Sequence, residues 1–153
     1  MRITYQDLER YRSNTIETAR QIGLDEVVLE KLQDTELVVV PGDSGRLFYG
    51  NANYEHNRVR VYEQNPSRYL PKTFQEVWNQ TGMDHELIGH LYNRYNGGRS
   101  DELAGVKTQL RFAAHRAKKD PYWALGLTII PIIPVIKRVT NLAKDHLHHS
   151  NNG

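Results

Sequence analysis

Apolar side chains recur every three to four positions along the first part of the chain, which is the period of an amphipathic helix. The pattern covers residues 5–22 and is ended by Gly23. A second, shorter helix is predicted from Asp25, a residue type favoured at the N-cap, through Leu32. We expect this helical pair to cover a sheet. The apolar positions of the first helix are Leu8, Tyr11, Thr15, Ala19 and Ile22.

The pattern then changes to one that is typical of β-strands. Residues 36–40 are rich in β-branched side chains and are followed by the turn-forming run Pro-Gly-Asp-Ser-Gly. Two more strands are predicted over residues 46–54 and 58–63. The expected fold class is α+β, with a small antiparallel sheet packed on helices.

Helical periodicity returns in the middle of the chain. A helix is predicted over residues 73–95, where Thr73 and Glu76 match a capping box. Phe74, Val77 and Trp78 are expected to face the core. The sequence Asn-Gly-Gly at 96–98 ends this helix.

A following helix is predicted to begin at Ser100, a favoured N-cap residue, and to end at Asp120-Pro121. Asp101 and Glu102 lie in its first turn, where acidic side chains suit the helix dipole. The glycine-rich turn before it lets this helix fold back across the preceding one. Its inner face is predicted to consist of Leu103, Val106, Leu110, Ala113 and Ala114.

The chemistry of the chain is concentrated in the sequence His85-Glu86-Leu87-Ile88-Gly89-His90. Zinc-protease helices usually carry their two histidines at i and i+4, whereas these are at i and i+5. On a regular α-helix, at about 100° per residue, the two imidazoles would point roughly 140° apart and could not share one ion. A π-bulge would return His90 to the face of His85, and Gly89 allows such a distortion.

This motif resembles the H-E-L-L-G-H element of the dipeptidyl peptidase III family of zinc peptidases, which carries the same one-residue expansion. It is also similar to the compact gluzincins, whose third zinc ligand is a glutamate on a following helix. The resemblance covers about twenty residues. The second motif of that family reads E-E-x-x-A, where this chain has Asp101-Glu102-Leu103-Ala104.

The resemblance implies a zincin-like fold with an active-site helix and a following glutamate helix. His85, His90 and Glu102 would bind Zn²⁺, and Glu86 would be the general base. In zinc peptidases of this layout an exposed edge strand lies above the metal helix and pairs with an extended substrate. Residues 50–54 are the candidate for that strand, and an ordinary irregular strand with a loop is the alternative.

Further residues are candidates for supporting roles. Asp101 could hold a ligand histidine in one tautomer through a hydrogen bond. The oxyanion of a tetrahedral intermediate needs a nearby cation or phenol. The candidates for that role are Tyr92, Tyr95, Arg111 and His115.

Composition limits the remaining possibilities. The chain has 153 residues and no cysteine, so a metal must be held by His, Asp or Glu. Its first residues carry no apolar signal region, and we expect a cytoplasmic protein. A net charge of +2 is too small to indicate nucleic-acid binding.

The chain is predicted to consist of one domain followed by two C-terminal segments. Residues 1–122 are predicted to form the single zincin-like domain, residues 123–145 an arm, and residues 146–153 a polar tail with three histidines. Residues 123–136 are almost wholly apolar but too short to span a membrane. They are interpreted as a packed extended arm, with a homo-oligomer contact, a partner-protein contact or a membrane-surface contact left open.

The predicted function is a zinc-dependent metallopeptidase that acts on a peptide or protein substrate. The alternative is a non-catalytic binding or scaffold protein of zincin fold that assembles through its apolar arm. The intact Glu86 favours the enzyme, because a scaffold has no need for a general base beside the first ligand.

Overall fold

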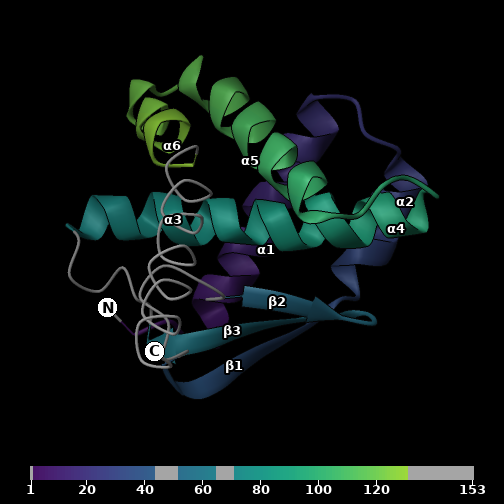
Figure 1. Ribbon diagram of the computed structural model, residues 1–153, viewed down its shortest axis with the longest axis horizontal. Coiled ribbons are helices and arrows are strands. Elements are labelled where there is room, and N and C mark those ends of the chain that lie inside the picture. Colours follow the sequence, from purple (N-terminus) through teal and green to yellow (C-terminus); the bar gives the residue numbers. More distant parts are fainter. Residues whose placement is uncertain (1, 44–51, 65–70, 131–153) are drawn as a thin grey trace, which may run out of the picture.

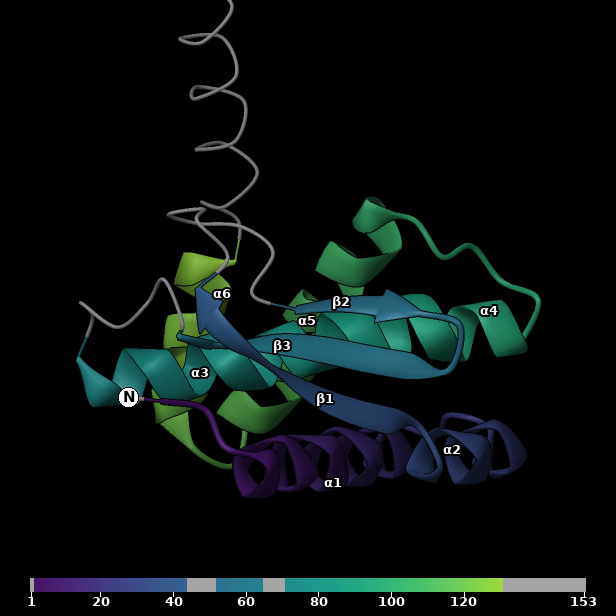
Figure 2. The same cartoon turned by 90° about the horizontal axis from the view of Figure 1, so that it is seen from below.

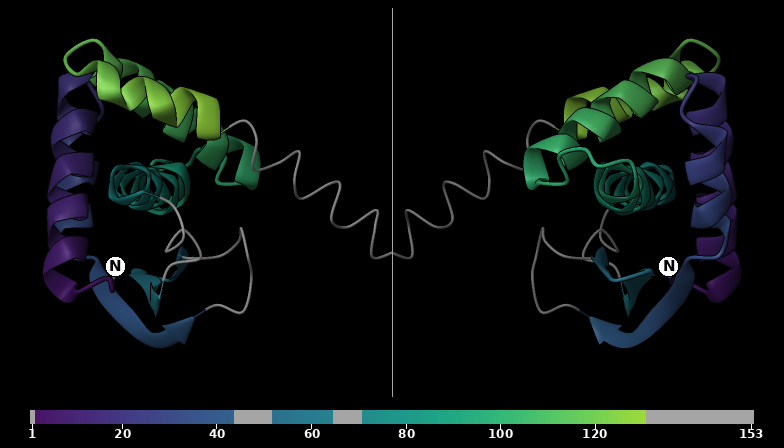
Figure 3. Two further views of the ribbon diagram at one scale, coloured as in Figure 1. Left: turned by 90° about the vertical axis from the view of Figure 1, so that its left-hand side faces the viewer. Right: turned by 90° about the vertical axis from the view of Figure 1, so that its right-hand side faces the viewer.

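The computed structural model describes residues 2–43, 52–64 and 71–130. One long helical segment, residues 72–95, runs through the middle of the molecule (Figure 1). Viewed nearly end-on, it is surrounded by helix α1 (Tyr5–Gln21) on one side, by helices α5 (Glu102–Ala117) and α6 (Ala124–Ile129) on another and by the sheet on a third (Figure 3). The α+β class predicted from the sequence is confirmed.

The two N-terminal helices agree closely with the predicted pattern. Helix α1 spans Tyr5–Gln21 and helix α2 spans Glu26–Gln33. Thr4 and Asp7 form a capping box at the start of α1, and the Asp25 carboxylate accepts a hydrogen bond from the Val28 amide at the start of α2. The apolar face of α1 enters the core as predicted, because Leu8, Tyr11 and Ala19 are almost fully buried.

The sheet is mixed, and the prediction of an antiparallel sheet is wrong for one of its two strand pairs. Strands β1 (Glu36–Asp43), β2 (Ala52–Glu55) and β3 (Arg58–Gln64) have the order β1-β3-β2. β2 and β3 form an antiparallel hairpin, whereas β1 is parallel to β3 (Figure 2). Because β3 takes the central position, β2 becomes an edge of the described sheet. Of the predicted strand 46–54, the part before Ala52 lies outside the described residues.

The central helical segment consists of α3 (Lys72–Asp84), a π-helix η2 (His85–Tyr92) and one last α-helical turn, α4 (Asn93–Tyr95). The predicted capping box at Thr73 is wrong. The helix begins at Lys72 after Pro71, without a side-chain cap. The Glu76 carboxylate instead accepts hydrogen bonds from the Tyr11 hydroxyl, at 2.9 Å, and from Arg10, at 3.1 Å, both on α1.

The chain then continues with α5 (Glu102–Ala117), a short 3₁₀ turn η3 (Pro121–Trp123) and α6 (Ala124–Ile129). The predicted inner face of α5 is mostly wrong, since Leu103 is 51% exposed. Its buried positions are Gly105, Gln109, Phe112, Ala113 and Arg116. The reason is that the contacts of α5 with η2 include a glycine, Gly105, and a polar side chain, Gln109.

The first residues of the predicted C-terminal arm belong to the same core. They form the helix α6 and not an extended strand, and α6 packs on α3 and α5. A Cβ built on Gly126 would stand 3.1 Å from Ala113 Cβ, and Ile130 is 1% exposed. The rest of the arm, from residue 131, and the polar tail lie outside the described residues. Within the described ranges, no helix has the length and apolar character needed to cross a membrane.

Candidate metal centre

The π-helix places the two motif histidines side by side. Its eight residues run from His85 to Tyr92, so the i, i+5 pair falls about one turn apart. The two imidazole centroids are 4.8 Å apart, with an angle of 64° between the ring planes. The predicted π-type distortion is therefore confirmed, and it extends over more than the single bulge that was expected.

The backbone of η2 is stabilised by a side chain. The Asn93 amide N–H reaches the carbonyl of Ile88, five residues earlier, which is the π-helical pattern. The Asn93 side-chain amide donates to the Gly89 carbonyl at 2.9 Å. Polar groups that a change of helix type would otherwise leave without a partner are thus satisfied.

A tight turn reverses the chain after η2. Asn96 ends the helix, and Gly97 has φ +69°, a left-handed conformation that glycine adopts without a steric penalty. The Gly98 amide donates to the Asn93 carbonyl at 2.7 Å, and the Gly97 amide to the Arg94 carbonyl at 3.3 Å. These two bonds form a Schellman motif. The chain is thereby turned back so that the start of α5 lies over the histidines.

Helix α5 crosses η2 at two glycines. A Cβ on Gly89 would lie only 2.5 Å from the Gly105 Cα, so the two backbones are in direct contact. A Cβ on Gly105 would lie 2.3 to 2.6 Å from three atoms of the His85 ring. Gly105 therefore leaves the space that this imidazole occupies. The prediction assigned Gly89 to helix distortion, and the structure shows that close helix packing also requires it.

Glu102 completes the cluster. Its Oε2 is 3.5 Å from His85 Nε2, and its Oε1 is 4.0 Å from His90 Nε2. Both distances exceed the usual range of an N–H···O hydrogen bond. One ligand atom from each of the three residues can be chosen so that all lie within 4.8 Å of one another.

This spacing fits a zinc site. With ligands about 2.0–2.1 Å from a tetrahedral zinc ion, two ligand atoms stand about 3.3 Å apart. The shorter of the two imidazole–carboxylate distances is close to that value, and Glu102, with a side chain 77% exposed, has room to adjust the other. The donor set of two imidazoles and one carboxylate is the type found in catalytic zinc sites. The residues present therefore fit the metal predicted from the sequence.

The second nitrogen of each imidazole has a defined oxygen partner. His90 Nδ1 lies 2.8 Å from the Ser100 carbonyl oxygen, and His85 Nδ1 lies 3.2 Å from Gln109 Oε1. In each case the Nε2 atom faces Glu102. Ser100 was predicted as a helix N-cap, but its backbone carbonyl contacts His90 and the cap is Asp101.

The two imidazoles lie in different electrostatic surroundings. Burial would lower the pKa of His85, but the carboxylates of Glu102 and Glu86 and the Gln109 oxygen outweigh it, so the pKa is raised above 6.5. Burial lowers the pKa of His90, and the positive charge of a protonated His85 adds to this effect. Glu86 is half-buried, and its carboxylate is close enough to raise the pKa of His85.

The other candidate residues have partners on other elements. The Tyr92 hydroxyl accepts from the Asp25 amide, and the Tyr95 hydroxyl donates to Asn57. His115 contacts Gln21 and Arg111 donates to the Ile22 carbonyl, both at the end of α1. These contacts do not place the four residues at the oxyanion of a substrate.

Asp101 also differs from its predicted role as a partner of a ligand histidine. Its carboxylate accepts from the Ala104 amide at 2.9 Å and pairs with Arg99. It is therefore a helix cap. The Nδ1 atoms of the two histidines instead face Ser100 and Gln109, and the prediction missed both contacts. Gln109 lies seven positions after Glu102, on the same helix face, and this spacing was the available signal.

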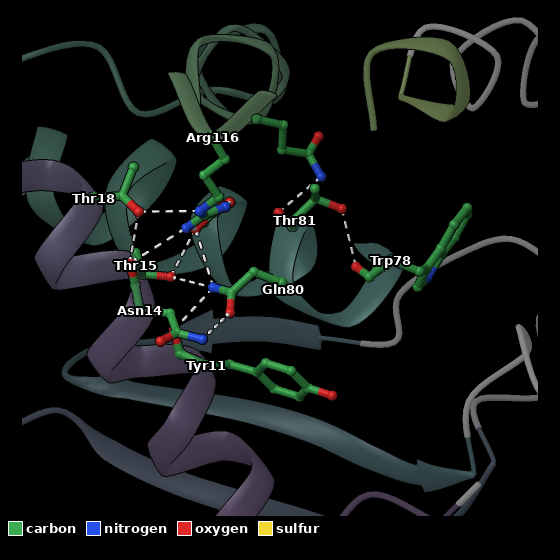
Figure 4. A network of polar contacts seen from close by, with 10 residues as sticks. Tyr11, Asn14, Thr15, Thr18, Trp78, Gln80, Thr81 and Arg116 are labelled. Carbon is green, nitrogen blue, oxygen red and sulfur yellow. Dashed lines mark hydrogen bonds and ion pairs between the residues drawn. The ribbon is translucent and has the colours of Figure 1, made fainter. Parts of the chain in front are cut away.

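A buried ion pair stabilises the helical segment directly before His85. Asp84, directly before His85, is fully buried and forms a two-point salt bridge with Arg116 of α5. The Thr15 hydroxyl donates to Asp84 at 2.7 Å, and Arg116 Nε donates to Thr18 at 3.0 Å, so α1 is included in the same network (Figure 4). The guanidinium also lies 4.8 Å from the Trp123 ring centroid. Three helices are thus fixed at the position where α3 changes into η2.

Comparisons of the chain with protein-family models, with curated proteins and with solved structures find no match. Function is therefore inferred from the geometry of the His85, His90 and Glu102 cluster.

Proposed function

We propose that this protein is a zinc-dependent metallopeptidase. The observation that carries the proposal is the convergence of His85 Nε2, His90 Nε2 and the Glu102 carboxylate, directly beside Glu86 in the sequence. A structural zinc site would have four protein ligands, whereas three leave one coordination position for water. This difference supports a catalytic site.

His85, His90 and Glu102 would hold the metal. A zinc ion bound there would supply a Lewis acid that lowers the pKa of a water molecule in the open coordination position. Glu86 would take the proton from this water and later deliver it to the leaving amine. The half-buried position of Glu86 gives it access to solvent water while it remains close to His85.

The position of β2 supports a peptide as the substrate. β2 is an edge of the described sheet and contacts η2, the helix that carries both histidines. An extended peptide can add to such an edge by main-chain hydrogen bonds, which would hold its backbone over the metal helix. Peptide or protein substrates are therefore proposed ahead of small amides.

The scaffold alternative would use the apolar C-terminal arm as an interface. Within the described residues, the start of that arm is packed on α3 and α5. This part is already used inside the fold, which makes the scaffold the weaker proposal.

The test is a peptide-cleavage assay on zinc-loaded protein with mixed peptide libraries, read by mass spectrometry. Wild type should cleave, and Glu86→Gln should lose roughly 10²–10⁴-fold in rate while it keeps its zinc, because only the general base is removed. The matched control is Glu76→Gln, which changes a carboxylate on the same helical segment that contacts α1. Folded, zinc-loaded wild-type protein without activity on any peptide would contradict the proposal.

A further inference from the structure

A neutral imidazole carries one proton and can bind a metal only through its other nitrogen. Which nitrogen is protonated depends on the hydrogen bond that the ring makes. Free imidazole side chains favour the form protonated at Nε2, which would block the atom that His85 directs toward Glu102. The site therefore needs a group that moves the proton of His85 to Nδ1.

Gln109 has the required contact. Its Oε1 lies 3.2 Å from His85 Nδ1, and its Nε2 donates to the Thr81 carbonyl at 3.0 Å. A carbonyl oxygen only accepts hydrogen bonds, so the contact with Thr81 fixes which end of the amide is the nitrogen. The oxygen end must then face His85. Since that oxygen can only accept, the ring must donate from Nδ1.

The surroundings make this arrangement hard to reverse. Gln109 is 7% exposed, and the His85 side chain is 12% exposed, so water has little access to replace a lost partner. Turning the amide over would set its nitrogen against Nδ1–H and its oxygen against the Thr81 carbonyl. Two buried contacts would be lost together, which is unfavourable. His90 reaches the same tautomer through the Ser100 carbonyl.

We propose that Gln109 is a positioning residue for His85: through the Thr81 carbonyl it holds the imidazole in the Nδ1–H form, which presents Nε2 to the metal. The inference rests on the metal site of the proposed function. Gln109 acts through His85, and nothing requires it to touch metal or substrate. It also links α5 to the last turns of α3, so the tautomer depends on the packing of these helices.

The first experiment is long-range ¹H–¹⁵N spectroscopy of the imidazoles in the full-length, chelator-treated protein, at a pH where His85 is neutral. The His85 signals are assigned by their absence in His85→Asn. Wild type should show His85 protonated at Nδ1, and Gln109→Met should shift it toward the Nε2–H form. This variant keeps the approximate side-chain length and removes both hydrogen bonds. Gln109→Glu keeps an acceptor for Nδ1 and should retain the wild-type tautomer.

The second experiment measures zinc affinity by competition with a chromophoric chelator. Gln109→Met should bind about 10–100-fold more weakly, as expected for loss of a group that orients a metal ligand, and Gln109→Glu should stay within about tenfold of wild type. The matched control is Gln80→Met. Gln80 is a buried glutamine of α3 that donates to the Tyr11 carbonyl, to Thr15 and to Asp84, and its amide makes no hydrogen bond to an imidazole of the described residues. Its loss should leave tautomer and affinity unchanged.

Two results would overturn the inference. One is a wild-type His85 protonated at Nε2, a result that does not depend on any Gln109 variant. The other is an equal loss of affinity in Gln109→Met, Gln109→Glu and Gln80→Met, which would mean that Gln109 only ties helices together. Neither readout uses peptide cleavage, so a protein that binds zinc through His85 and cleaves nothing would refute the proposed function and leave this inference standing.

Discussion

Gly105→Ala should abolish the metal site and leave the fold in place. The added Cβ would stand 2.3 Å from His85 Cε1 and 2.5 Å from His85 Nε2, whereas ordinary contact begins near 3.4 Å. The imidazole would have to move by at least about 1 Å. The Nδ1 atom of this ring is hydrogen-bonded to Gln109, and the His90 ring lies against one side of it. The His85 ring can therefore move only by breaking these contacts. Metal–ligand distances are expected within about 0.2 Å of their standard values, so a displacement of this size takes His85 Nε2 out of range.

The expected effects follow from these distances. Loss of a residue that only orients a metal ligand typically lowers affinity by about 10–100-fold. Because Gly105→Ala displaces a ligand itself, zinc affinity should fall by more than about 100-fold. Stability should change much less. Alanine is favoured over glycine in a helix by roughly 1 kcal/mol, while overpacking costs about 1–3 kcal/mol. The free energy of unfolding without metal should therefore fall by no more than about 2 kcal/mol.

The assay pairs chelator competition for zinc with urea unfolding in the presence of excess chelator. Gly82→Ala is the matched control, because a Cβ at Gly82 has nothing within 4 Å. It should keep wild-type zinc affinity and unfold at the same or a higher urea concentration. If Gly105→Ala bound zinc as tightly as wild type, the placement of the His85 ring against Gly105 would be wrong.

Three further predictions follow from the same contacts. Gly89→Ala places a Cβ 2.5 Å from the Gly105 Cα, where backbone must move, so the unfolding free energy should fall by about 1–3 kcal/mol or more; a neutral effect in urea unfolding would contradict the helix crossing. Arg116→Met leaves Asp84 buried without its cation and should cost about 3–5 kcal/mol by the same measurement; a cost below about 1 kcal/mol would argue against the ion pair. In metal-free protein the pKa of His85 should be above 6.5, which an NMR titration can check. The stability contributed by this raised pKa is fully present below pH 6.5 and is lost as the pH rises through the folded-state pKa of His85. Glu102→Gln should lower the pKa of His85, and an unchanged His85 pKa in that variant would refute the contribution of Glu102.

Features that depend on local sequence were predicted well. The boundaries of α1 and α2 follow from caps and apolar periodicity within a few residues, and the structure reproduces both. The π-helix was predictable for a different reason. The spacing of His85 and His90 is incompatible with a shared ion on a regular α-helix, so a distortion was the one local geometry that reconciles the spacing with the chemistry.

Features that depend on distant partners were not predictable in the same way. The continuous apolar run of residues 37–40 is compatible with parallel pairing. Its partner β3 comes after β2 in the chain, so the run alone did not identify the parallel β1–β3 pair. Glu76 matches a capping box, but α1 offers it a tyrosine hydroxyl and a guanidinium. The tertiary contacts replace the local one.

The same distinction applies to the candidate site. His85 and His90 were singled out by their residue type and spacing, and Glu102 by the resemblance to the gluzincins; the structure places the three side chains close together. Gly105 and Gln109 were missed, because a glycine and a glutamine are common helix residues whose role appears only when α5 is placed on η2. The Asp84–Arg116 pair was missed because its partners are 32 positions apart.

His85, His90 and Glu102 are proposed to bind one zinc ion, and a measurement of metal stoichiometry decides whether they do. Elemental mass spectrometry after dialysis should use a chain in which His146, His148 and His149 are replaced by asparagine, since a histidine tract binds metal nonspecifically. About one zinc per chain is expected in this background, with loss of zinc in His85→Ala and retention in Glu86→Gln. A folded protein without stoichiometric zinc, or with zinc that His85→Ala does not remove, would contradict it.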